Sequence, residues 1–224
     1  MTSLNTYIDH TKLGPTVSLE QIDQLIQEGL QYEFKSLCVN THFVFYVSNK
    51  LKGSPVLTCT VIGFPHGSHT KDVKAFETKE AIQAGADEID MVINNTFVKA
   101  KDYQKTYEDI KAVVNAADGK TVKVILETCY LTEEEIIFAC QCAKDAGANF
   151  VKTSTGFGSG GATFEHVKLM KQTVQDALEV KASGGIRNRD DALKMIEAGA
   201  TRIGTSKGVE IMENKEMSNA NTTY

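Results

Sequence analysis

The sequence predicts an α/β protein folded as a single closed (β/α)₈ TIM barrel. Short β-rich runs alternate with amphipathic stretches along the whole chain, which is typical of parallel strands joined by crossover helices. The tripeptide Ala-Gly-Ala occurs at residues 84–86, 146–148 and 198–200, each time just before a β-rich run. Glycine permits the left-handed turn that ends a helix. Because this unit recurs, a closed barrel is favoured over the alternative, an open doubly wound sheet.

Eight β-rich runs are predicted as strands, and helical stretches separate them. In chain order the strands cover residues 7–11, 35–39, 56–62, 88–93, 121–127, 149–154, 179–183 and 201–205. Two helix starts carry a capping box, at residues 18–21 and 132–135, in which a hydroxyl and a later Gln or Glu side chain each accept from the other residue's backbone N–H. The Ala-Gly-Ala tripeptides predict where three helices end.

Length and composition indicate one globular domain. The chain has 224 residues, of which 42% are hydrophobic and 24% charged, enough for one large core. We expect the domain to cover residues 1–212. Residues 213–224 are polar and show no period, so they are predicted to form a mobile C-terminal tail.

Composition also excludes several classes of function. No apolar stretch approaches the ~20 residues that span a bilayer, and the N-terminus lacks signal-peptide features, so we expect a cytoplasmic protein without a membrane partner. Five cysteines without CxxC spacing predict reduced thiols. A net charge of −5 without a basic cluster argues against nucleic acid but leaves room for a local cationic pocket. The five histidines form no HxH or HExxH pattern, so no metal site is predicted.

Two lysines near the ends of neighbouring predicted strands carry the expected chemistry. Lys152 and Lys181 are 29 residues apart (181 minus 152), one strand–helix unit, which places them on adjacent parallel strands about 4.8 Å apart. A lysine inside a buried strand needs a partner or a function. Burial and a neighbouring like charge both lower a lysine's pKa, and an amine needs this to attack a carbonyl at neutral pH.

An aspartate is expected to join the two lysines. Asp90 interrupts the apolar run 88–93, and side chains two residues apart share one face of a strand. If Asp90, Lys152 and Lys181 all point into the barrel, they converge. The alternative is a buried ion pair of Asp90 with one lysine that has no catalytic role. We favour the catalytic interpretation because perturbed ionisable groups gather at functional sites.

Glycine-rich segments follow the last three predicted strands. Two of them, at 183–186 and 204–208, follow strands seven and eight, where such barrels often bind phosphate through backbone amides and a helix N-terminus. A third, at 153–161, is a candidate lid or amide cradle. The alternative is ordinary turn glycine. The arrangement predicts a small phosphorylated ligand at this face of the barrel.

Seven motifs lie in order along nearly the whole chain. They are YIDHT at 7–11, SLCVN at 36–40, GFPHG at 63–67, DEIDMV at 87–92, VKTSTG at 151–156, VKASGGIR at 180–187 and RIGTS at 202–206. In this combination the sequence resembles the deoxyribose-phosphate aldolases, a class I aldolase family. The resemblance implies reversible cleavage of 2-deoxy-D-ribose 5-phosphate to D-glyceraldehyde 3-phosphate and acetaldehyde in deoxyribonucleoside catabolism, without metal or other cofactor.

The resemblance also implies roles for individual residues. Lys152 matches the Schiff-base lysine, Lys181 matches the second lysine that lowers its pKa, and Asp90 moves protons together with Lys181. The implied substrate-binding residues are Asp9, Thr11, Cys38, Thr155 and Gly156. The implied phosphate-binding residues are Gly184, Gly185, Gly204, Ser206 and Lys207.

Two positions depart from the family pattern, and one lies at the chain end. Phe157 stands where the family can have lysine, and Lys207 stands where it often has serine. Either lysine favours an anion, so this exchange alters the phosphate contacts and leaves the reaction unchanged. The family uses a C-terminal tyrosine as a proton relay, and Tyr224 ends this chain. The family also forms homodimers or homotetramers.

Two other functions are compatible with the same residues. A sugar-phosphate isomerase would use Asp90 as its base and the lysines only as electrostatic stabilisers, so Lys152→Arg would keep measurable turnover. A non-catalytic barrel that binds a phosphorylated metabolite would need only the glycine loops. Ligand binding without turnover would favour that third hypothesis.

Overall fold

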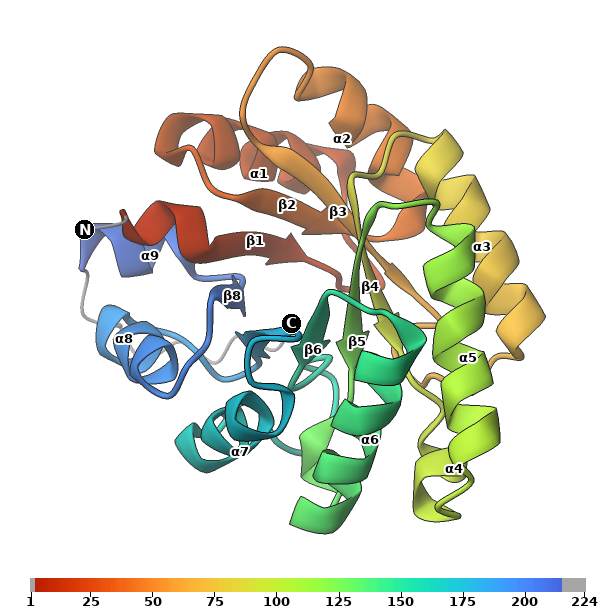
Figure 1. Cartoon of the computed structure of the whole chain (residues 1–224). Helices are drawn as coiled ribbons and strands as arrows, with labels where there is room; N and C mark the ends of the chain where they lie inside the picture. Colours follow the sequence, from red (N-terminus) through yellow and green to blue (C-terminus); the bar gives the residue numbers. More distant parts are fainter. Residues whose placement is uncertain (1–2, 215–224) are drawn as a thin grey trace.

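Eight parallel strands close into a barrel in the computed structural model, which describes residues 3–214 (Figure 1). Each strand pairs with the next, and β1 pairs with β8 through Ile8–Ile203 and Asp9–Gly204. This closure confirms the predicted TIM barrel and excludes the open sheet. The strands are β1 Ile8–Lys12, β2 Ser36–Val39, β3 Leu57–Ile62, β4 Glu88–Val92, β5 Thr121–Ile125, β6 Phe150–Lys152, β7 Glu179–Ser183 and β8 Arg202–Thr205.

All eight predicted strands are present; β7 has the predicted bounds, and the ends of the others differ from prediction by at most two residues. The largest differences are at the carboxyl ends of β5 and β6. Strand β5 stops at Ile125 because Glu127 has a left-handed backbone, with φ 56° and ψ 63°, that an extended strand cannot contain. Strand β6 stops at Lys152, where the chain enters its glycine-rich connection.

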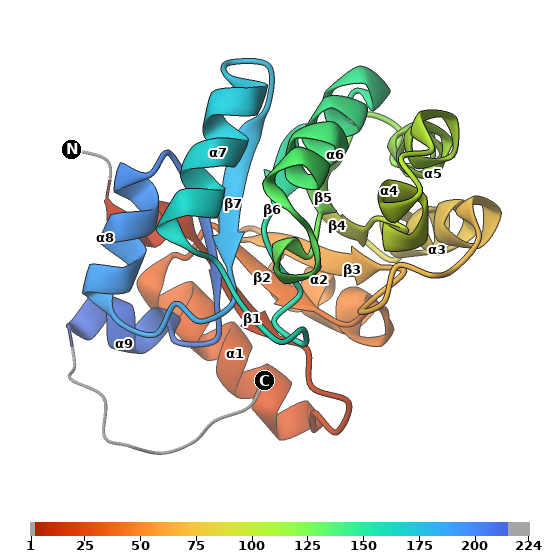
Figure 2. The same cartoon turned by 90° about the horizontal axis from the view of Figure 1, so that it is seen from below.

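Helices surround the barrel, as the two perpendicular views show (Figures 1 and 2). Both predicted capping boxes are confirmed, at Ser18 with Gln21 and at Thr132 with Glu135. Three helices end at the Ala-Gly-Ala tripeptides, as predicted. The α-helices are α1 Leu19–Tyr32, α2 Val44–Lys50, α3 Lys71–Gln83, α4 Asn95–Lys99, α5 Tyr103–Ala116, α6 Glu133–Ala146, α7 Phe164–Val174, α8 Arg189–Glu197 and α9 Gly208–Glu213; short 3₁₀ helices cover Leu4–Tyr7, Thr41–Phe43 and Thr128–Tyr130.

The main apolar core lies between the strands and the helices, whereas the barrel interior is charged. On β4, Ile89 and Met91 belong to the apolar core, while Glu88 and Asp90 alternate with them. All four side chains are buried. The alternation of side chains therefore sends one set into the helix layer and the other into the centre of the barrel.

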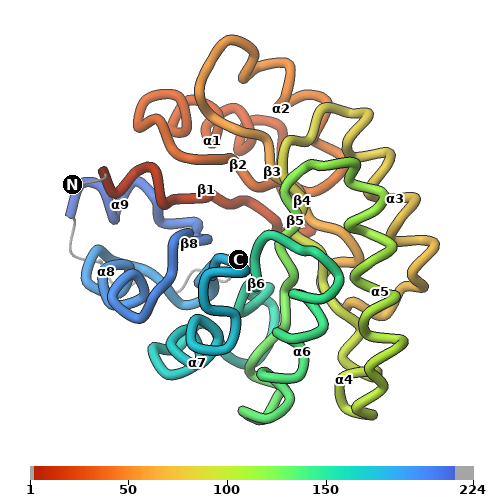
Figure 3. The backbone as a smooth tube through the Cα atoms, in the orientation of Figure 1, coloured from red at the N-terminus to blue at the C-terminus, as the bar shows by residue number. Residues whose placement is uncertain are grey.

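The ends of the described chain lie close to the barrel seam, where β1 runs beside β8 (Figure 3). Helix α9 ends at Glu213, one residue beyond the predicted boundary at 212, and the Tyr32 hydroxyl donates to Glu213 at 2.5 Å. Tyr224 and nearly all of the predicted tail lie outside the described residues. Within residues 3–214 every helix is too short or too polar to span a bilayer.

Candidate active site

The predicted convergence of Asp90, Lys152 and Lys181 is present in the structure. Lys152 on β6 and Lys181 on β7 are paired in register. Both ammonium groups donate to the same oxygen, Oδ2 of Asp90 on β4, each at 2.7 Å. Asp90 and Lys181 are fully buried, and Lys152 keeps an exposed fraction of 3%. Two lysines on adjacent strands therefore share one carboxylate oxygen at the bottom of the site.

This triad belongs to a larger buried ion network. Lys123 on β5 lies 2.8 Å from Asp90 Oδ1 and 2.6 Å from Glu88 Oε2. Arg202 on β8 lies 2.8 Å from both Glu88 and Asp9, and Asp9 also contacts Lys181 at 2.5 Å. The network contains four basic side chains, Lys123, Lys152, Lys181 and Arg202, and three carboxylates, Asp9, Glu88 and Asp90. If every group were ionised, one positive charge would be in excess.

Lys152 is the lysine of this network with the fewest carboxylate partners. Within residues 3–214 its one carboxylate partner is Asp90, whereas Lys181 has Asp9 and Asp90, and Lys123 has three carboxylates within 4 Å. Burial lowers the pKa of Lys181, but Asp9 and Asp90 outweigh it and raise this pKa above its ordinary value. The same opposition raises the pKa of Lys123. Of the three lysines, Lys152 is therefore the one that carboxylates hold least.

Asp90 is held as a carboxylate. Burial alone raises the pKa of Asp90, but Lys123, Lys152 and Lys181 together hold it well below its ordinary value. Asp9 shows the same pattern, with Lys181 as its strongest stabilising charge. Asp90 therefore stays ionised and accepts a hydrogen bond from each lysine.

The depressed pKa values of Asp9 and Asp90 predict loss of stability in acid. Their folded pKa values lie below the unfolded value of about 3.9, so the unfolded chain takes up protons first as the pH falls. Their stabilising contribution is therefore complete above about pH 4 and is lost as the pH falls towards the folded pKa values. Urea unfolding over a series of acidic pH values measures this, and the fall should be shallower in Asp90→Asn. A free energy of unfolding unaffected by acid would contradict the proposed charge state of the network.

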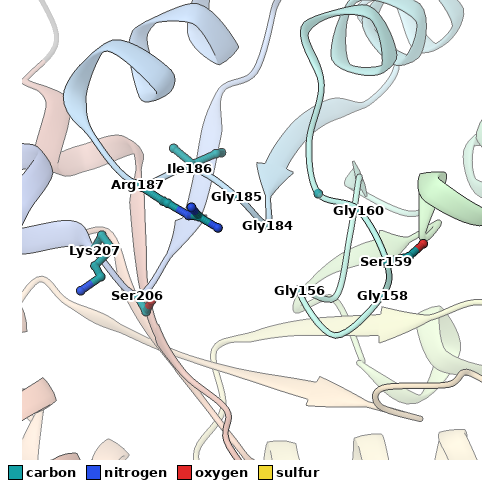
Figure 4. Close-up of a pocket in the computed structure, with 11 residues that line it drawn as sticks. Gly156, Gly158, Ser159, Gly160, Gly184, Gly185, Ile186, Arg187, Ser206 and Lys207 are labelled. Atoms are coloured by element: carbon teal, nitrogen blue, oxygen red, sulfur yellow. The ribbon is translucent and has the colours of Figure 1, made fainter. Parts of the chain in front are cut away.

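A cavity of about 250 Å³ opens where β6, β7 and β8 end (Figure 4). The glycine-rich connection after β6 forms one side, and the connections after β7 and β8 bring Arg187 and Lys207 to the other. The loops touch closely, since a Cβ atom on Gly161 would lie 2.2 Å from the carbonyl oxygen of Gly184. The cavity is lined by Gly156, Gly158, Ser159, Gly160, Gly161, Gly184, Gly185, Ile186, Arg187, Ser206 and Lys207. Backbone amides and two cationic side chains suit a phosphate group.

Four of the five predicted phosphate-binding residues line this cavity, as does Gly156. Gly204 has another position, inside β8. A Cβ atom there would lie 3.0 Å from Cε of Lys181 and 2.9 Å from Cβ of Ser183. Gly204 therefore makes room for the second lysine.

The remaining predicted substrate-binding residues lie at different depths. Asp9 is fully buried within the ion network. Thr11 lines a smaller cavity of about 190 Å³ that shares Ser206 and Lys207 with the first. Cys38 is fully buried on β2, opposite Cys59 on β3. Thr155 is buried just after β6 and donates to Glu127.

Within residues 3–214, two groups of side chains have potential metal-ligating atoms within 4.8 Å of one another. They are Cys38, Cys59 and Asp90, and Asp9, Cys59 and Glu88. Each carboxylate in these groups already binds a lysine or arginine nitrogen at 2.5–2.8 Å. These carboxylates therefore serve as partners of basic side chains in this structure.

Comparison with known proteins identifies the family. The sequence profile of the DeoC/LacD family aldolases matches residues 4–213. The chain belongs to this aldolase family. It is 60% identical over 215 residues to the deoxyribose-phosphate aldolase of Streptococcus sanguinis, covering 96% of this chain and 98% of the relative. It is 56% identical over 221 residues to that of Acholeplasma laidlawii, covering 99% of both.

A solved structure supports the same assignment. The tetrameric deoxyribose phosphate aldolase from Aeropyrum pernix superposes with a TM-score of 0.88 at 32% sequence identity, covering 94% of this chain and 89% of that one. The family profile match over residues 4–213 spans all eight strands, so the fold and the family agree.

Several residues of the site were missed by sequence reasoning. Lys123 stands alone among apolar residues in β5, the same signal that singled out Lys152, and it could have been found in this way. Glu88 and Arg202 begin their strands, where charged residues are common, so their burial was not evident. Arg187 and Glu127 follow strands, and only the folded loops bring them to the site.

Proposed function

We propose that this aldolase cleaves 2-deoxy-D-ribose 5-phosphate reversibly to D-glyceraldehyde 3-phosphate and acetaldehyde, through a Schiff base on Lys152. The observation that carries the proposal is the single Asp90 oxygen shared by Lys152 and Lys181. A structural ion pair needs one lysine there, whereas imine chemistry needs a nucleophilic amine, a neighbouring cation and a proton acceptor. Such a reaction belongs to the breakdown of deoxyribonucleosides.

The covalent steps follow from these three groups. The neutral amine of Lys152 attacks the C1 aldehyde to form a carbinolamine, which loses water to give an iminium ion. The C3 hydroxyl then loses its proton, the C2–C3 bond breaks, and its electrons move towards the iminium nitrogen. This step releases D-glyceraldehyde 3-phosphate and leaves an enamine. Protonation of the enamine at C2 and hydrolysis release acetaldehyde.

Lys181 and Asp90 supply the proton transfers. Asp90 accepts hydrogen bonds from both lysines, so a proton can pass between Lys181 and the reacting nitrogen through one carboxylate oxygen. The positive charge on Lys181 also disfavours a second buried positive charge on Lys152. The pair thus prepares the nucleophile and returns protons to the intermediates. Tyr224, which lies outside the described residues, is proposed as an additional relay.

The cavity beyond β7 and β8 is proposed to hold the substrate phosphate. Gly184, Gly185 and Ser206 offer backbone and hydroxyl donors, and Lys207 and Arg187 offer positive charge. Phe157 packs edge-on against Phe64, with ring centroids 5.4 Å apart. Phe157 has no charge to offer, so in this proposal Lys207, in the connection after β8, supplies the cation that the family can have at position 157.

Borohydride trapping tests the nucleophile, the intermediate and the substrate class together. The protein is incubated with acetaldehyde and borohydride, digested, and analysed by mass spectrometry. We expect a reduced adduct on the peptide that contains Lys152, since reduction of the imine makes the bond permanent. An adduct found only on other peptides would overturn the assignment.

The assembly and location are also proposals. The tetrameric relative supports a homodimer or homotetramer, and the aromatic side chains of Phe45 and Phe76 are 69% and 66% exposed on α2 and α3. Light scattering during gel filtration measures the mass directly. A cytoplasmic location suits an enzyme of nucleoside breakdown, and the five cysteines are free thiols.

A further inference from the structure

A buried carboxylate outside the ion network controls one residue of the substrate site. Glu127 follows β5 and has a left-handed backbone, which turns its side chain towards the connection after β6. Its exposed fraction is 3%. Both of its oxygens accept from the backbone N–H of Thr155, at 3.3 Å each, and Oε2 also accepts from the Thr155 hydroxyl. The reaction steps described above do not use this carboxylate.

The hydrogen bonds of the Thr155 hydroxyl use its proton and one of its two lone pairs. A hydroxyl has one proton to donate and two lone pairs to accept. The proton is donated to Glu127, and one lone pair accepts from the backbone N–H of Phe157 at 3.0 Å. One lone pair remains. Towards any ligand, Thr155 can therefore accept a hydrogen bond and cannot donate one.

The neighbouring loop keeps this arrangement in place. A Cβ atom on Gly158 would lie 3.0 Å from Cδ of Glu127 and 2.9 Å from Sγ of Cys129, so the loop backbone passes directly over the carboxylate. Burial raises the pKa of Glu127, and the hydrogen bonds from Thr155 and the charge of Lys152 oppose this rise. Assays at alkaline pH keep the carboxylate ionised and the hydroxyl in its accepting state.

In the sequence, Thr155 stands between two residues assigned to opposite ends of the substrate. Lys152, which would hold C1, is three residues before it, and Gly156, which lines the phosphate cavity, comes directly after it. The groups of the substrate between the aldehyde and the phosphate are hydroxyls. A hydroxyl is both donor and acceptor, whereas a phosphate dianion can only accept. A residue limited to accepting thus fits a sugar hydroxyl and does not fit the phosphate.

We propose that Glu127 is a specificity-determining positioning residue, which fixes Thr155 as an acceptor and so selects acceptor aldehydes that carry a hydroxyl between carbonyl and phosphate. This inference rests on the proposed function, because it assigns a direction to a substrate contact of that reaction. Glu127 acts through Thr155 and does not touch the reacting atoms.

The test compares two acceptor aldehydes in the synthetic direction with acetaldehyde as donor. One is D-glyceraldehyde 3-phosphate, and the other is 3-hydroxypropanal phosphate, which lacks only the middle hydroxyl. We expect the natural chain to prefer the hydroxylated acceptor in kcat/KM, and Glu127→Gln to reduce this preference about tenfold, since one directional hydrogen bond is worth roughly 1–2 kcal/mol. The glutamine amide can donate to the Thr155 oxygen, which frees the Thr155 proton and removes the fixed direction.

Controls separate this role from a structural one. Thr155→Val should lose the preference as Glu127→Gln does, while Thr155→Ser should keep it. Glu77→Gln is the matched control, because Glu77 on α3 holds another loop by accepting from the backbone N–H of Gly63 at 2.8 Å. It should leave the preference unchanged. If Glu127→Gln does not fold, Thr155→Val and Thr155→Ser carry the test by themselves.

Trapping of acetaldehyde on Lys152 distinguishes the possible failures. We expect Glu127→Gln to form the reduced adduct at the rate of the natural chain, because donor activation does not involve Thr155. An unchanged acceptor preference in Glu127→Gln, or an equal loss of trapping and of acceptor turnover, would overturn the inference. Absence of any Lys152 adduct in the natural chain would instead overturn the proposed function.

Discussion

Lys152→Met is expected to lower kcat/KM for 2-deoxy-D-ribose 5-phosphate cleavage by about 10⁴-fold or more, while the fold is retained. A thioether cannot form an imine, so the covalent route is lost. The ion network tolerates the change, because three basic groups then face three carboxylates and Asp90 Oδ2 keeps its bond from Lys181. Formation of D-glyceraldehyde 3-phosphate measures the activity, and thermal unfolding measures the stability.

A second substitution at the same position separates the aldolase from an isomerase. Arginine keeps its proton at all accessible pH values, so Lys152→Arg also cannot attack a carbonyl and should be equally inactive. Measurable turnover in Lys152→Arg would support an electrostatic role for this cation. Lys144→Met on α6 is the matched control, since Lys144 is exposed on a helix outside the barrel strands. It should preserve both activity and unfolding temperature.

Lys123→Met is expected to lower the free energy of unfolding by about 3–5 kcal/mol, the usual cost of removing one partner from a buried ion pair. Lys123 is fully buried, and its loss leaves Glu88 Oε2 and Asp90 Oδ1 without contacts of 2.6 and 2.8 Å. Urea unfolding at neutral pH measures the change. Lys120→Met is the control, because Lys120 precedes the same strand but pairs with Asp87 at 3.5 Å near the surface.

The same substitution should also impair catalysis. Without Lys123, the three carboxylates are balanced only if Lys152 carries a proton, so the ammonium form of the nucleophile is favoured. We expect slower trapping of acetaldehyde in the folded variant and a pH–rate profile displaced to alkaline pH. Stability and trapping like those of the natural chain would show that Lys123 does not control the charge of Lys152.

The secondary structure could be predicted because its signals are local. Capping boxes act within four residues, and Ala-Gly-Ala ends a helix through the backbone of one glycine. Strands were recognised by composition, and the spacing of Lys152 and Lys181 correctly placed them on adjacent strands. Side-chain alternation on β4 correctly separated Asp90 from its apolar neighbours.

The ion network could not be predicted in the same way. Glu88, Lys123 and Arg202 come from strands far apart in sequence, and their partners depend on the register around the whole barrel. A strand pattern shows which residues share a face but does not show which charges meet across the interior. Gly204 illustrates the limit, since its place beside Lys181 depends on the pairing of β7 with β8.

The sequence alone therefore determined the barrel, the order of its strands, the two lysines with their aspartate, and the glycine loops, because each rests on short-range pattern or spacing. Only the tertiary structure decided the ion partners of Lys152, the depth of Asp9 and Cys38, and the hydrogen bonds between Thr155 and Glu127. These depend on burial and on contacts between distant segments. Closing the barrel removes water from one set of side chains, and the partners available there set their charge.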